Sequence, residues 1–433
     1  MLKLNQKRRK SIFIRAAILA GTAFCAQDAY ATDGYFLDGV GASASGSGGV
    51  AIAMPQDSLA IATNPATATA LDTRIDVGVE VFAPDRSTTI HGNAFPTPTG
   101  GMASLNGYYS GNGSNPFVLP NLGVVKKLSP SLAVGLAIYG NGGMDTNYKT
   151  NPFANFGAQG NAGVDLKQIF ITPTVAKELT YGQSIGISPT IAIQSFRATG
   201  IQPFTVASAD PAHFTNLGES WSAGVGFRVG YYGNFGGLLG IGAYYQSKVG
   251  TGKFGKYAGL FNNSGSFDIP SNWGVGISTG IINPVTIGFD YKRINYSDAS
   301  SVSMPLAPLF TGVPFGAVGG PGFGWKNISV FKIGMALKAT PRLTLRAGYS
   351  HSGNPVQASQ TFLNILAPGV VQDHLTLGAS WNSRHNLIVT GYLMHALRNT
   401  VAGNGSIPAN YGGGEADVSL SETSAGISLG FKL

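Results

Sequence analysis

From about residue 74 to the end of the chain, apolar and polar side chains alternate in short runs. Between Arg74 and Phe82, every second residue is isoleucine or valine, and the positions between them hold charged residues or glycine. The same alternation recurs at 132–138, 183–194 and 221–229. Because successive side chains of a strand point to opposite faces, this pattern predicts strands with one apolar face and one small or polar face.

About fourteen such segments follow one another, an even number as single-chain bacterial barrels require. They start near residues 73, 116, 131, 165, 183, 219, 237, 271, 284, 326, 342, 372, 385 and 422. Long connections, at 84–115, 141–164, 198–218, 249–270, 296–325, 351–371 and 396–421, alternate with tight turns. Long loops on one side and short turns on the other are typical of outer-membrane barrels. We therefore expect an all-β fold over residues 72–433, a transmembrane antiparallel β-barrel of about 14 strands.

Composition supports a membrane barrel. Only 11% of the residues are charged and 62 are glycine, whereas about 25% are charged in a typical soluble domain. No apolar run in the sequence reaches the roughly 20 residues that a membrane-spanning helix needs. A soluble β-sandwich is the main alternative, but it gives no reason for alternating loop lengths and would not tolerate so many outward apolar side chains.

The first 31 residues have the features of a secretory signal peptide. Lys7–Lys10 are basic, Ile12–Ala23 are mostly apolar, and Ala29–Ala31 match an A-x-A cleavage site. We expect residues 1–31 to be removed together with the single cysteine, Cys25, which excludes disulfides and thiol chemistry. Removal lowers the 28 basic and 20 acidic residues by six and one, to 22 and 19, a net charge of +3. Nucleic-acid binding thereby loses its main support.

Residues 32–71 are too rich in glycine and alanine for a strand and too polar to cross a bilayer. A bend is expected at GSGGV, and Asp57 is placed to cap a short helix over Ser58–Ala62. Asn64 and Pro65 then end that helix, because proline disfavours the α conformation of the residue before it. The position before a barrel predicts an N-terminal hatch that plugs the lumen. The alternative, a phosphate-binding loop at GSGGV, lacks a preceding buried strand and a following Lys-Ser or Lys-Thr.

Four segments carry a resemblance to a known family. They are GYFLDGVG (34–41), MPQDSLAIATNPA (54–66), WKNISVFKIGMALKATPRLTLRAGYSHSGNPV (325–356) and HLTLGASW (374–381). Together they resemble the FadL family of outer-membrane transporters for long-chain fatty acids and other hydrophobic compounds. The resemblance is most specific at 54–66 and extends over most of the chain.

The resemblance implies that an N-terminal aromatic residue reaches the ligand site, at positions that correspond to Tyr35 and Phe36. We also expect Asn64, Pro65 and Ala66 to be the fixed point of the hatch. The asparagine can hydrogen-bond the turn, the proline fixes φ at about −65°, and the alanine allows close approach to the barrel wall.

Two basic residues, Lys332 and Arg346, are expected to face the lumen in segments that match the family. A carboxylate ligand would be stabilised by such a buried cation. The alternative is equally open: the two side chains pair with lumen acids such as Asp76 or Glu80.

The expected outer loops contain two apolar stretches, KFGKYAGLF (253–261) and MPLAPLFTGVPFGAVGGPGF (304–323). An apolar patch exposed to water usually marks a binding site, and the resemblance favours capture of a hydrophobic ligand. The residues expected to form this landing surface are Phe254, Tyr257, Leu260 and Phe261. In the alternative interpretation, the loops merely pack on one another.

These patterns and the resemblance predict passive, hatch-gated uptake of hydrophobic compounds across the outer membrane of a Gram-negative bacterium, without a cofactor or metal. Long-chain fatty acids and aromatic or aliphatic hydrocarbons both remain compatible, because both need an apolar lining. The expected partners are the ligand, outer-membrane lipid and the outer-membrane assembly machinery. We expect a monomer that binds no nucleic acid.

Two other functions stay open. A general diffusion porin should lack the hatch and have acidic loops. An outer-membrane lipid hydrolase needs a serine within reach of a histidine. His351 and His374 are the suggestive histidines, but no G-x-S-x-G motif lies near either of them. We therefore expect a protein that is not an enzyme.

Overall fold

The computed structural model describes residues 33–280 and 283–433. The expected signal peptide lies outside the described residues. Within them, one sheet of sixteen strands contains two short additions, β4 and β11, and fourteen long strands that close into an antiparallel barrel. β1 pairs with β18, and β9 pairs with β10, so the long strands leave no open edge. The predicted barrel of 14 strands is confirmed.

The long strands are β1 (Arg74–His91), β5 (Phe117–Ser129), β6 (Leu132–Asp145), β7 (Gly163–Thr180), β8 (Gln183–Thr199), β9 (Ser220–Phe235), β10 (Leu239–Gln246), β12 (Asn272–Thr279), β13 (Val285–Ile294), β14 (Ile328–Lys338), β15 (Leu343–Ser352), β16 (Asp373–Asn382), β17 (Leu387–Val401) and β18 (Glu415–Lys432). The short strands are β2 (Phe95–Pro96), β3 (Met102–Ala103), β4 (Gly107–Ser110) and β11 (Gly250–Thr251). Most long strands begin within two residues of the prediction. The exception is β18, which begins at Glu415 instead of near residue 422 because it continues beside the long β1 as far as His91.

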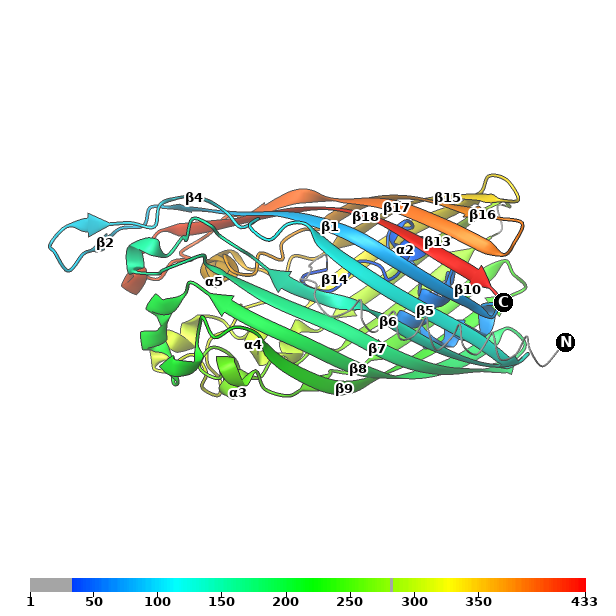
Figure 1. The fold of residues 1–433 in the computed structure, drawn as a ribbon, viewed down its shortest axis with the longest axis horizontal. Coiled ribbons are helices and arrows are strands. Elements are labelled where there is room, and N and C mark those ends of the chain that lie inside the picture. The colour runs from blue at the N-terminus through cyan, green and yellow to red at the C-terminus, as the bar shows by residue number, and fades with distance from the viewer. Residues whose placement is uncertain (1–32, 281–282) are drawn as a thin grey trace.

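Short helices occupy the hatch and the long loops. They are α2 (Ala42–Ser45), α3 (Asn262–Gly265), α4 (Ser300–Ser303) and α5 (Thr361–Asn364), and the 3-10 helices η1 (Ser58–Ala62), η2 (Pro65–Ala70), η3 (Ala154–Phe156), η4 (Gln202–Ala207), η5 (Pro211–His213), η6 (Gly255–Tyr257), η7 (Tyr296–Asp298), η8 (Ala307–Thr311), η9 (Ala358–Gln360) and η10 (Ala409–Tyr411). Among the described residues, no helix is both long and apolar enough to cross a membrane. Figure 1 shows α3, α4 and α5 at one end of the barrel and the C-terminus at the other.

The barrel wall separates apolar and polar side chains as the alternation predicts. Val77 and Val81 on β1 are 48% and 45% exposed on the outer face. Asp76, on the opposite face of the same strand, is only 2% exposed. Farther round the barrel, Ile187 on β8 and Val225 on β9 also point outward. This apolar outer face suits contact with lipid, and the polar inner face suits a filled lumen.

The N-terminal segment fills the lumen as the predicted hatch, here defined as residues 33–71. Every residue from 41 to 54 is buried, and the blue segment with α2 lies inside the ring of strands (Figure 1). Asp57 caps η1 by accepting a hydrogen bond of 3.0 Å from the backbone N–H of Leu59, as predicted. η1 ends at Ala62, before Asn64 and Pro65, as predicted. Pro65 is in addition the first residue of a second 3-10 helix, η2, a position that fits its fixed φ and missing N–H.

Candidate functional site

The hatch touches the inner wall mainly where the wall carries glycine. A Cβ atom on Gly348 would lie 2.1 Å from the backbone nitrogen of Gly48, and one on Gly334 would lie 2.2 Å from the carbonyl oxygen of Ser47. Real Cβ contacts are never this short, so only glycine permits this approach. Other wall glycines that would meet the hatch are Gly123, Gly186, Gly230, Gly240, Gly242, Gly276 and Gly288. The high glycine content is therefore partly a requirement of the plugged lumen.

Asn64, Pro65 and Ala66 lie against the wall as predicted. The fully buried Asn64 side chain donates hydrogen bonds of 2.9 Å to the carbonyl oxygens of Ile52 and of Tyr231 on β9. Its Oδ1 accepts from the backbone N–H of Ala66 at 3.1 Å, which caps η2. One side chain thus links two parts of the hatch and the barrel wall, although its effect on transport stays a prediction.

A second anchor comes from the wall. The Asp290 carboxylate on β13 accepts hydrogen bonds of 2.8 and 3.0 Å from the backbone N–H groups of Ala51 and Ile52. On the opposite side of the hatch, Asp76 on β1 accepts from the backbone N–H of Ser58 at 2.9 Å. Hydrogen bonds to charged groups are stronger than those between neutral groups. These carboxylates therefore hold hatch backbone that forms no regular ladder.

Lys332 lies in the predicted position but has different partners from those expected. Its Nζ is 2.8 Å from Oδ1 of Asp38 and 3.5 Å from Oδ2 of Asp33, both in the hatch. Pairing with Asp76 or Glu80 is therefore wrong for Lys332. Burial raises the pKa of the hatch residue Asp38, but the positive charge of Lys332 and its hydrogen bond outweigh this and leave the pKa below its usual value.

Phe36 and Lys292 complete the site beside Lys332. Lys292 Nζ lies 3.1 Å from Oδ2 of Asp33 and 5.4 Å from the centre of the Phe36 ring, a cation–π distance. A small hollow with a cavity volume of about 50 Å³ lies here. Its lining includes Phe36, Val40, Ile52, Tyr139, Arg228, Tyr244, Asp290, Lys292 and Lys332. The hollow thus combines apolar rings with the ion-paired Lys292 and Lys332, and with Arg228, whose guanidinium donates to Tyr139 and Gln246.

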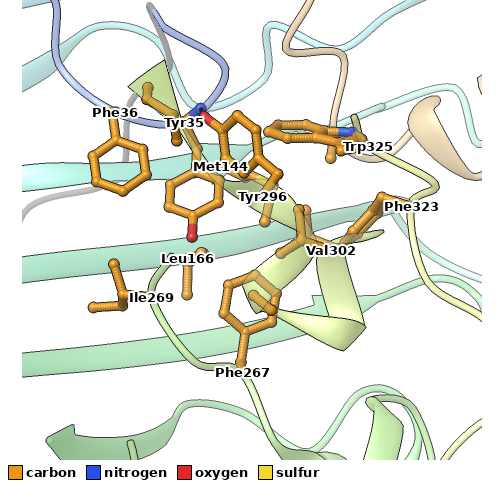
Figure 2. Close-up of a cluster of buried hydrophobic side chains, with 14 of the residues drawn as sticks. Tyr35, Phe36, Met144, Leu166, Phe267, Ile269, Tyr296, Val302, Phe323 and Trp325 are labelled. Carbon is orange, nitrogen blue, oxygen red and sulfur yellow. Dashed lines mark hydrogen bonds between the residues drawn. The ribbon is translucent and has the colours of Figure 1, made fainter. Parts of the chain in front are cut away.

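Tyr35 packs into an aromatic cluster behind Phe36 (Figure 2). Its ring centre lies 5.1 Å from that of Phe36, 5.4 Å from Tyr296 and 5.9 Å from Trp325. The backbone N–H of Tyr35 also donates to the Tyr296 hydroxyl at 3.1 Å. Phe36 therefore lines the hollow, while Tyr35 supports it from the side. Ligand contact by either residue stays a prediction.

Arg346 is not part of the same hollow. On paired strands, Lys332 faces Ser350 and Arg346 faces Ala336, which places the two cations roughly 13 Å apart along the strands. Arg346 donates to Oε1 of Gln56 and to the Ser380 hydroxyl, each at 2.6 Å. One carboxylate head group cannot contact both cations in this arrangement. A head-group role for either cation stays a prediction.

The four residues expected to form a landing surface do not form a water-exposed patch. Phe254 and Tyr257 are fully buried, Phe261 is 4% exposed and Leu260 is partly buried. Their rings pack on Phe196 of β8, with centres 5.7, 4.9 and 4.5 Å away for Phe254, Tyr257 and Phe261. The loops pack on one another, because large aromatic side chains gain most by leaving water.

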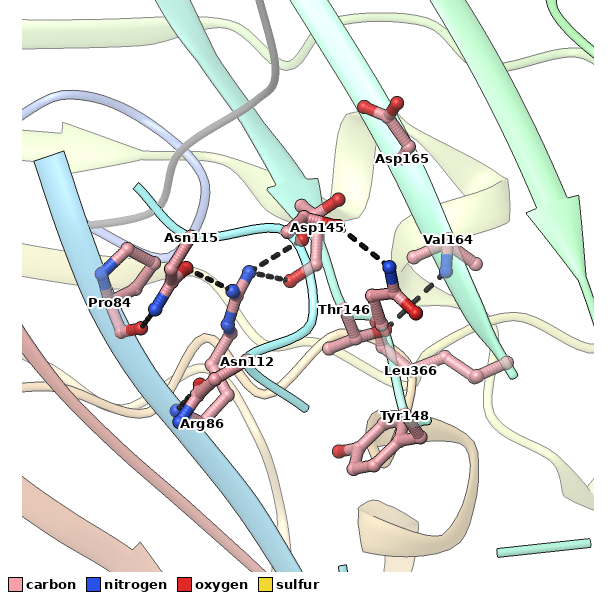
Figure 3. A network of polar contacts seen from close by, with 12 residues as sticks. Pro84, Arg86, Asn112, Asn115, Asp145, Thr146, Tyr148, Val164, Asp165 and Leu366 are labelled. Carbon is pink, nitrogen blue, oxygen red and sulfur yellow. Dashed lines mark hydrogen bonds and ion pairs between the residues drawn. The ribbon is translucent and has the colours of Figure 1, made fainter. Parts of the chain in front are cut away.

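A buried polar network around Arg86 was not predicted from the sequence. Arg86 on β1 forms an ion pair of 2.7 Å with Asp145 at the end of β6 and donates to Asn115 Oδ1 at 2.6 Å. Figure 3 shows Arg86 between these two partners. Nearby, the Thr146 hydroxyl donates to the carbonyl oxygen of Leu366 at 2.8 Å. The network ties β1 and β6 to a long loop that enters the barrel mouth.

The match to a protein family covers nearly all of this architecture. A family model described as "Outer membrane protein transport protein (OMPP1/FadL/TodX)" matches residues 22–426. The chain belongs to this family. Curated proteins compared with it by sequence gave no match.

Solved structures share the fold of this family member. A Pseudomonas aeruginosa FadL homologue has a TM-score of 0.69 at 16% identity, over 92% of this chain and 99% of that chain. The Pseudomonas putida toluene transporter TodX has 0.65 at 18%, over 93% and 100%. The Ralstonia pickettii toluene transporter TbuX has 0.61 at 19%, over 92% and 99%. At these identities the likeness concerns the fold alone.

Family membership makes this chain an outer-membrane transport protein. In the part of the chain that the structure describes, no hydrogen bond joins the side chain of His351 or His374 to a serine. His351 lies 2.8 Å from Asp373. His374 is buried, and neither of its ring nitrogens has a hydrogen-bond partner in residues 33–280 and 283–433.

Proposed function

We propose that this protein carries hydrophobic compounds passively across the outer membrane and that the hatch is its gate. The observation that carries the proposal is the position of Phe36 and Lys332: both line a hollow at the point where hatch and wall are joined by ion pairs. A ligand that enters the hollow would compete with those contacts. Displacement of the hatch, or a sideways gap in the wall, would then release the ligand.

The filled lumen supports this proposal over a general diffusion porin. A porin needs an aqueous channel through the barrel. Here the residues from 41 to 54 are buried inside it, and wall glycines at Gly334 and Gly348 are fitted to the hatch backbone. A permanently open pore would not require wall glycines that fit the hatch backbone this closely.

The charges around the hollow favour an uncharged ligand. Lys332 and Lys292 are paired with Asp33 and Asp38, and Asp290 already accepts two backbone hydrogen bonds. A fatty-acid carboxylate would have to displace a buried carboxylate from Lys332, whereas a hydrocarbon would leave the pairs intact. Two of the structural relatives are described as toluene transporters. We therefore infer that neutral aromatic or aliphatic hydrocarbons are preferred over long-chain fatty acids.

Uptake in a deletion strain tests this inference. Cells that lack the gene, with and without the gene restored, would receive labelled p-xylene, dodecane or palmitate. We expect restoration to raise hydrocarbon uptake several-fold with a smaller effect on palmitate. Equal uptake of all three compounds with and without the gene would contradict the transport proposal. A rise for palmitate alone would contradict only the preference for neutral ligands.

We infer the remaining properties from the barrel and the expected leader together. Residues 1–31 act as the signal peptide, the assembly machinery inserts the chain, and the monomer lies in outer-membrane lipid of a Gram-negative cell without catalysing a reaction. N-terminal sequencing of the mature protein should begin at Thr32. Its mass in a detergent micelle should correspond to one chain.

A further inference from the structure

A second hollow, here called the periplasmic hollow, has a cavity volume of about 340 Å³. It is bounded by the turn between β16 and β17 and by the end of β18, at the end of the barrel opposite to α3, α4 and α5 (Figure 1). Short turns face the periplasm in outer-membrane barrels. The periplasmic hollow shares no lining residue with the hollow beside Phe36. Its volume lies within the roughly 300–1,000 Å³ of small-molecule sites.

Among the described residues, three basic side chains and no acidic one line the periplasmic hollow. The basic residues are Arg74, Arg346 and Lys432. Most of the other lining side chains carry a hydroxyl or an amide group, and two of them, Leu387 and Ile388, are apolar. Cations, hydroxyl groups and amides offer many hydrogen-bond donors to an oxyanion. This lining therefore suits a polar anion and not a hydrocarbon.

Two of the three cations already have carboxylate partners outside the lining. Arg74 donates to both oxygens of Asp76, at 2.6 and 2.8 Å. Lys432 Nζ lies 2.9 Å from Oδ2 of Asp72. The charge balance of the periplasmic hollow therefore depends on the third cation, Arg346.

Arg346 has only neutral hydrogen-bond partners among the described residues, although it is only 9% exposed. Its Nε donates to Gln56 and its Nη1 to the Ser380 hydroxyl, which leaves Nη2 without a hydrogen bond in the described part of the chain. Asp57 interacts electrostatically with Arg346, but it caps η1 and forms no ion pair with this arginine. A buried cation without an anion is unfavourable. An anion in the hollow would remove this cost.

We propose that the periplasmic hollow binds a small polar compound that carries one carboxylate or phosphate group. The oxyanion accepts from the unused N–H groups of Arg346. Hydrogen bonds between two charged groups are roughly twice as strong as neutral ones. Hydroxyl groups on the rest of the compound meet the hydroxyl and amide side chains of the lining.

The bound compound also joins the hatch to the wall. Ser43 and Gln56 of the lining belong to the hatch, whereas Arg346 and Ser380 belong to β15 and β16. The complete lining exists only while the hatch is in place, and a ligand stabilises the state that binds it. A periplasmic anion therefore favours the closed barrel. This control goes beyond the proposed transport of hydrophobic compounds.

Other occupants fit the periplasmic hollow less well. A hydrocarbon leaves Arg346 without an anion, and a cation meets three basic side chains. Water fills the space but supplies no negative charge. The phosphate of a lipid head group has the same chemistry as a free phosphate compound, so the experiment has to separate these two sources.

The test compares glucose 6-phosphate and glucuronate with glucose, which has the same ring without the charge. Binding to the purified protein would be measured by titration calorimetry in dodecyl maltoside, a detergent without an anionic group. We expect at least one of the two anions to bind about tenfold more tightly than glucose, the effect of a hydrogen bond between charged groups. Weaker binding of that anion in nanodiscs of phosphatidylglycerol would identify the lipid head group as the occupant. Unchanged binding would identify a free compound.

The decisive variant is Arg346→Gln, which removes the charge and keeps a hydrogen-bonding side chain. It should bind the anions no more tightly than glucose. Lys338→Gln is the matched control, because it removes a positive charge from an exposed position near the same turns that does not line the hollow. It should keep the preference of the wild type. A heat-modifiable gel shift would verify that each barrel is folded.

The same anion should slow proteolysis of the hatch several-fold in the wild type and leave the rate unchanged in Arg346→Gln. Equal binding of all three compounds by the wild type would overturn the site, as would an unchanged preference in Arg346→Gln or an equal loss in Lys338→Gln. Tight binding without slower proteolysis would overturn the control of the hatch. None of these assays measures uptake, so p-xylene uptake that depends on the gene would leave the transport proposal standing.

Discussion

Lys332 on β14 and Asp38 in the hatch form an ion pair of 2.8 Å between two side chains that are both nearly inaccessible to solvent. They lie 294 residues apart in sequence. The Ser350 hydroxyl donates to the same Asp38 oxygen at 2.7 Å. The pair therefore joins the plug to two adjacent strands of the wall. Breaking a buried pair by removing one partner costs about 3–5 kcal/mol, because the other charge is left uncompensated.

Replacing Lys332 with methionine should loosen the hatch. The variant leaves Asp38 buried without its cation, so we expect frequent channel openings in planar lipid bilayers where the wild type stays closed. The double variant Lys332→Met with Asp38→Asn should open less often than Lys332→Met alone, because the uncompensated charge is gone. Lys338→Met is the control, since Lys338 is exposed at the end of the same strand.

Closed channels in all of these variants would show that the ion pair does not hold the hatch. Openings in Lys338→Met equal to those in Lys332→Met would show that any change on β14 has this effect. Equal opening in the single and double variants would show that the uncompensated charge of Asp38 does not cause the openings.

An added methyl group at Gly348 should displace the hatch from the wall. The new Cβ would lie 2.1 Å from the backbone nitrogen of Gly48. Moving β15 would break its strand pairing, and moving Gly48 would break the hydrogen bond of 2.8 Å from its N–H to the Thr376 hydroxyl. We expect faster proteolysis of the hatch in Gly348→Ala, measured from the periplasmic side. Gly250→Ala should behave as wild type, because no atom lies within 4 Å of a Cβ there. Equal proteolysis rates in the two variants would contradict a tight fit.

Truncation of Phe254 should unfold the outer loops without opening the barrel. Phe254 is fully buried against Phe196 and Phe261, and loss of a buried phenylalanine side chain costs about 3–5 kcal/mol. We expect Phe254→Ala loops to be cleaved by protease added to whole cells, with the heat-modifiable band retained. Phe310→Ala is the control because Phe310 is 44% exposed. Intact loops in Phe254→Ala would mean that the aromatic cluster does not stabilise them.

Local patterns were sufficient to predict the barrel. Side-chain alternation such as Val77, Val79 and Val81 is a direct record of which face meets lipid, since a shift by one residue reverses every side chain. Strand ends were harder to place at the outer rim. There β1 and β18 continue to His91 and Glu415 beyond the apolar stretch, because backbone pairing persists after the need for an apolar face has ended.

The site was predicted less completely, because its contacts join residues far apart in the chain. Lys332 was recognised as a lumen cation, but its partner Asp38 could not be chosen from among the lumen acids without the register of the hatch. A usable signal was present: Asp33 and Asp38 lie in a segment expected to be buried, and buried carboxylates require cations or hydrogen bonds. The prediction that the loop aromatics are exposed failed for another reason. Composition alone does not distinguish Phe254, which packs inward, from Phe310, which faces water.

Asn64→Ala should change transport without unfolding the barrel. The substitution removes hydrogen bonds of 2.9 Å to Ile52 and Tyr231 and the cap of 3.1 Å on Ala66. Lost caps and bonds of this kind cost about 1–2 kcal/mol each, whereas the strands close through backbone pairs that do not involve the hatch. We expect normal protein levels and a normal gel shift, together with altered p-xylene uptake or new channel openings. Asn404→Ala, in an exposed loop, should match the wild type in every assay. If Asn64→Ala also matches the wild type in uptake and conductance, this asparagine is a turn residue and the hatch is held elsewhere.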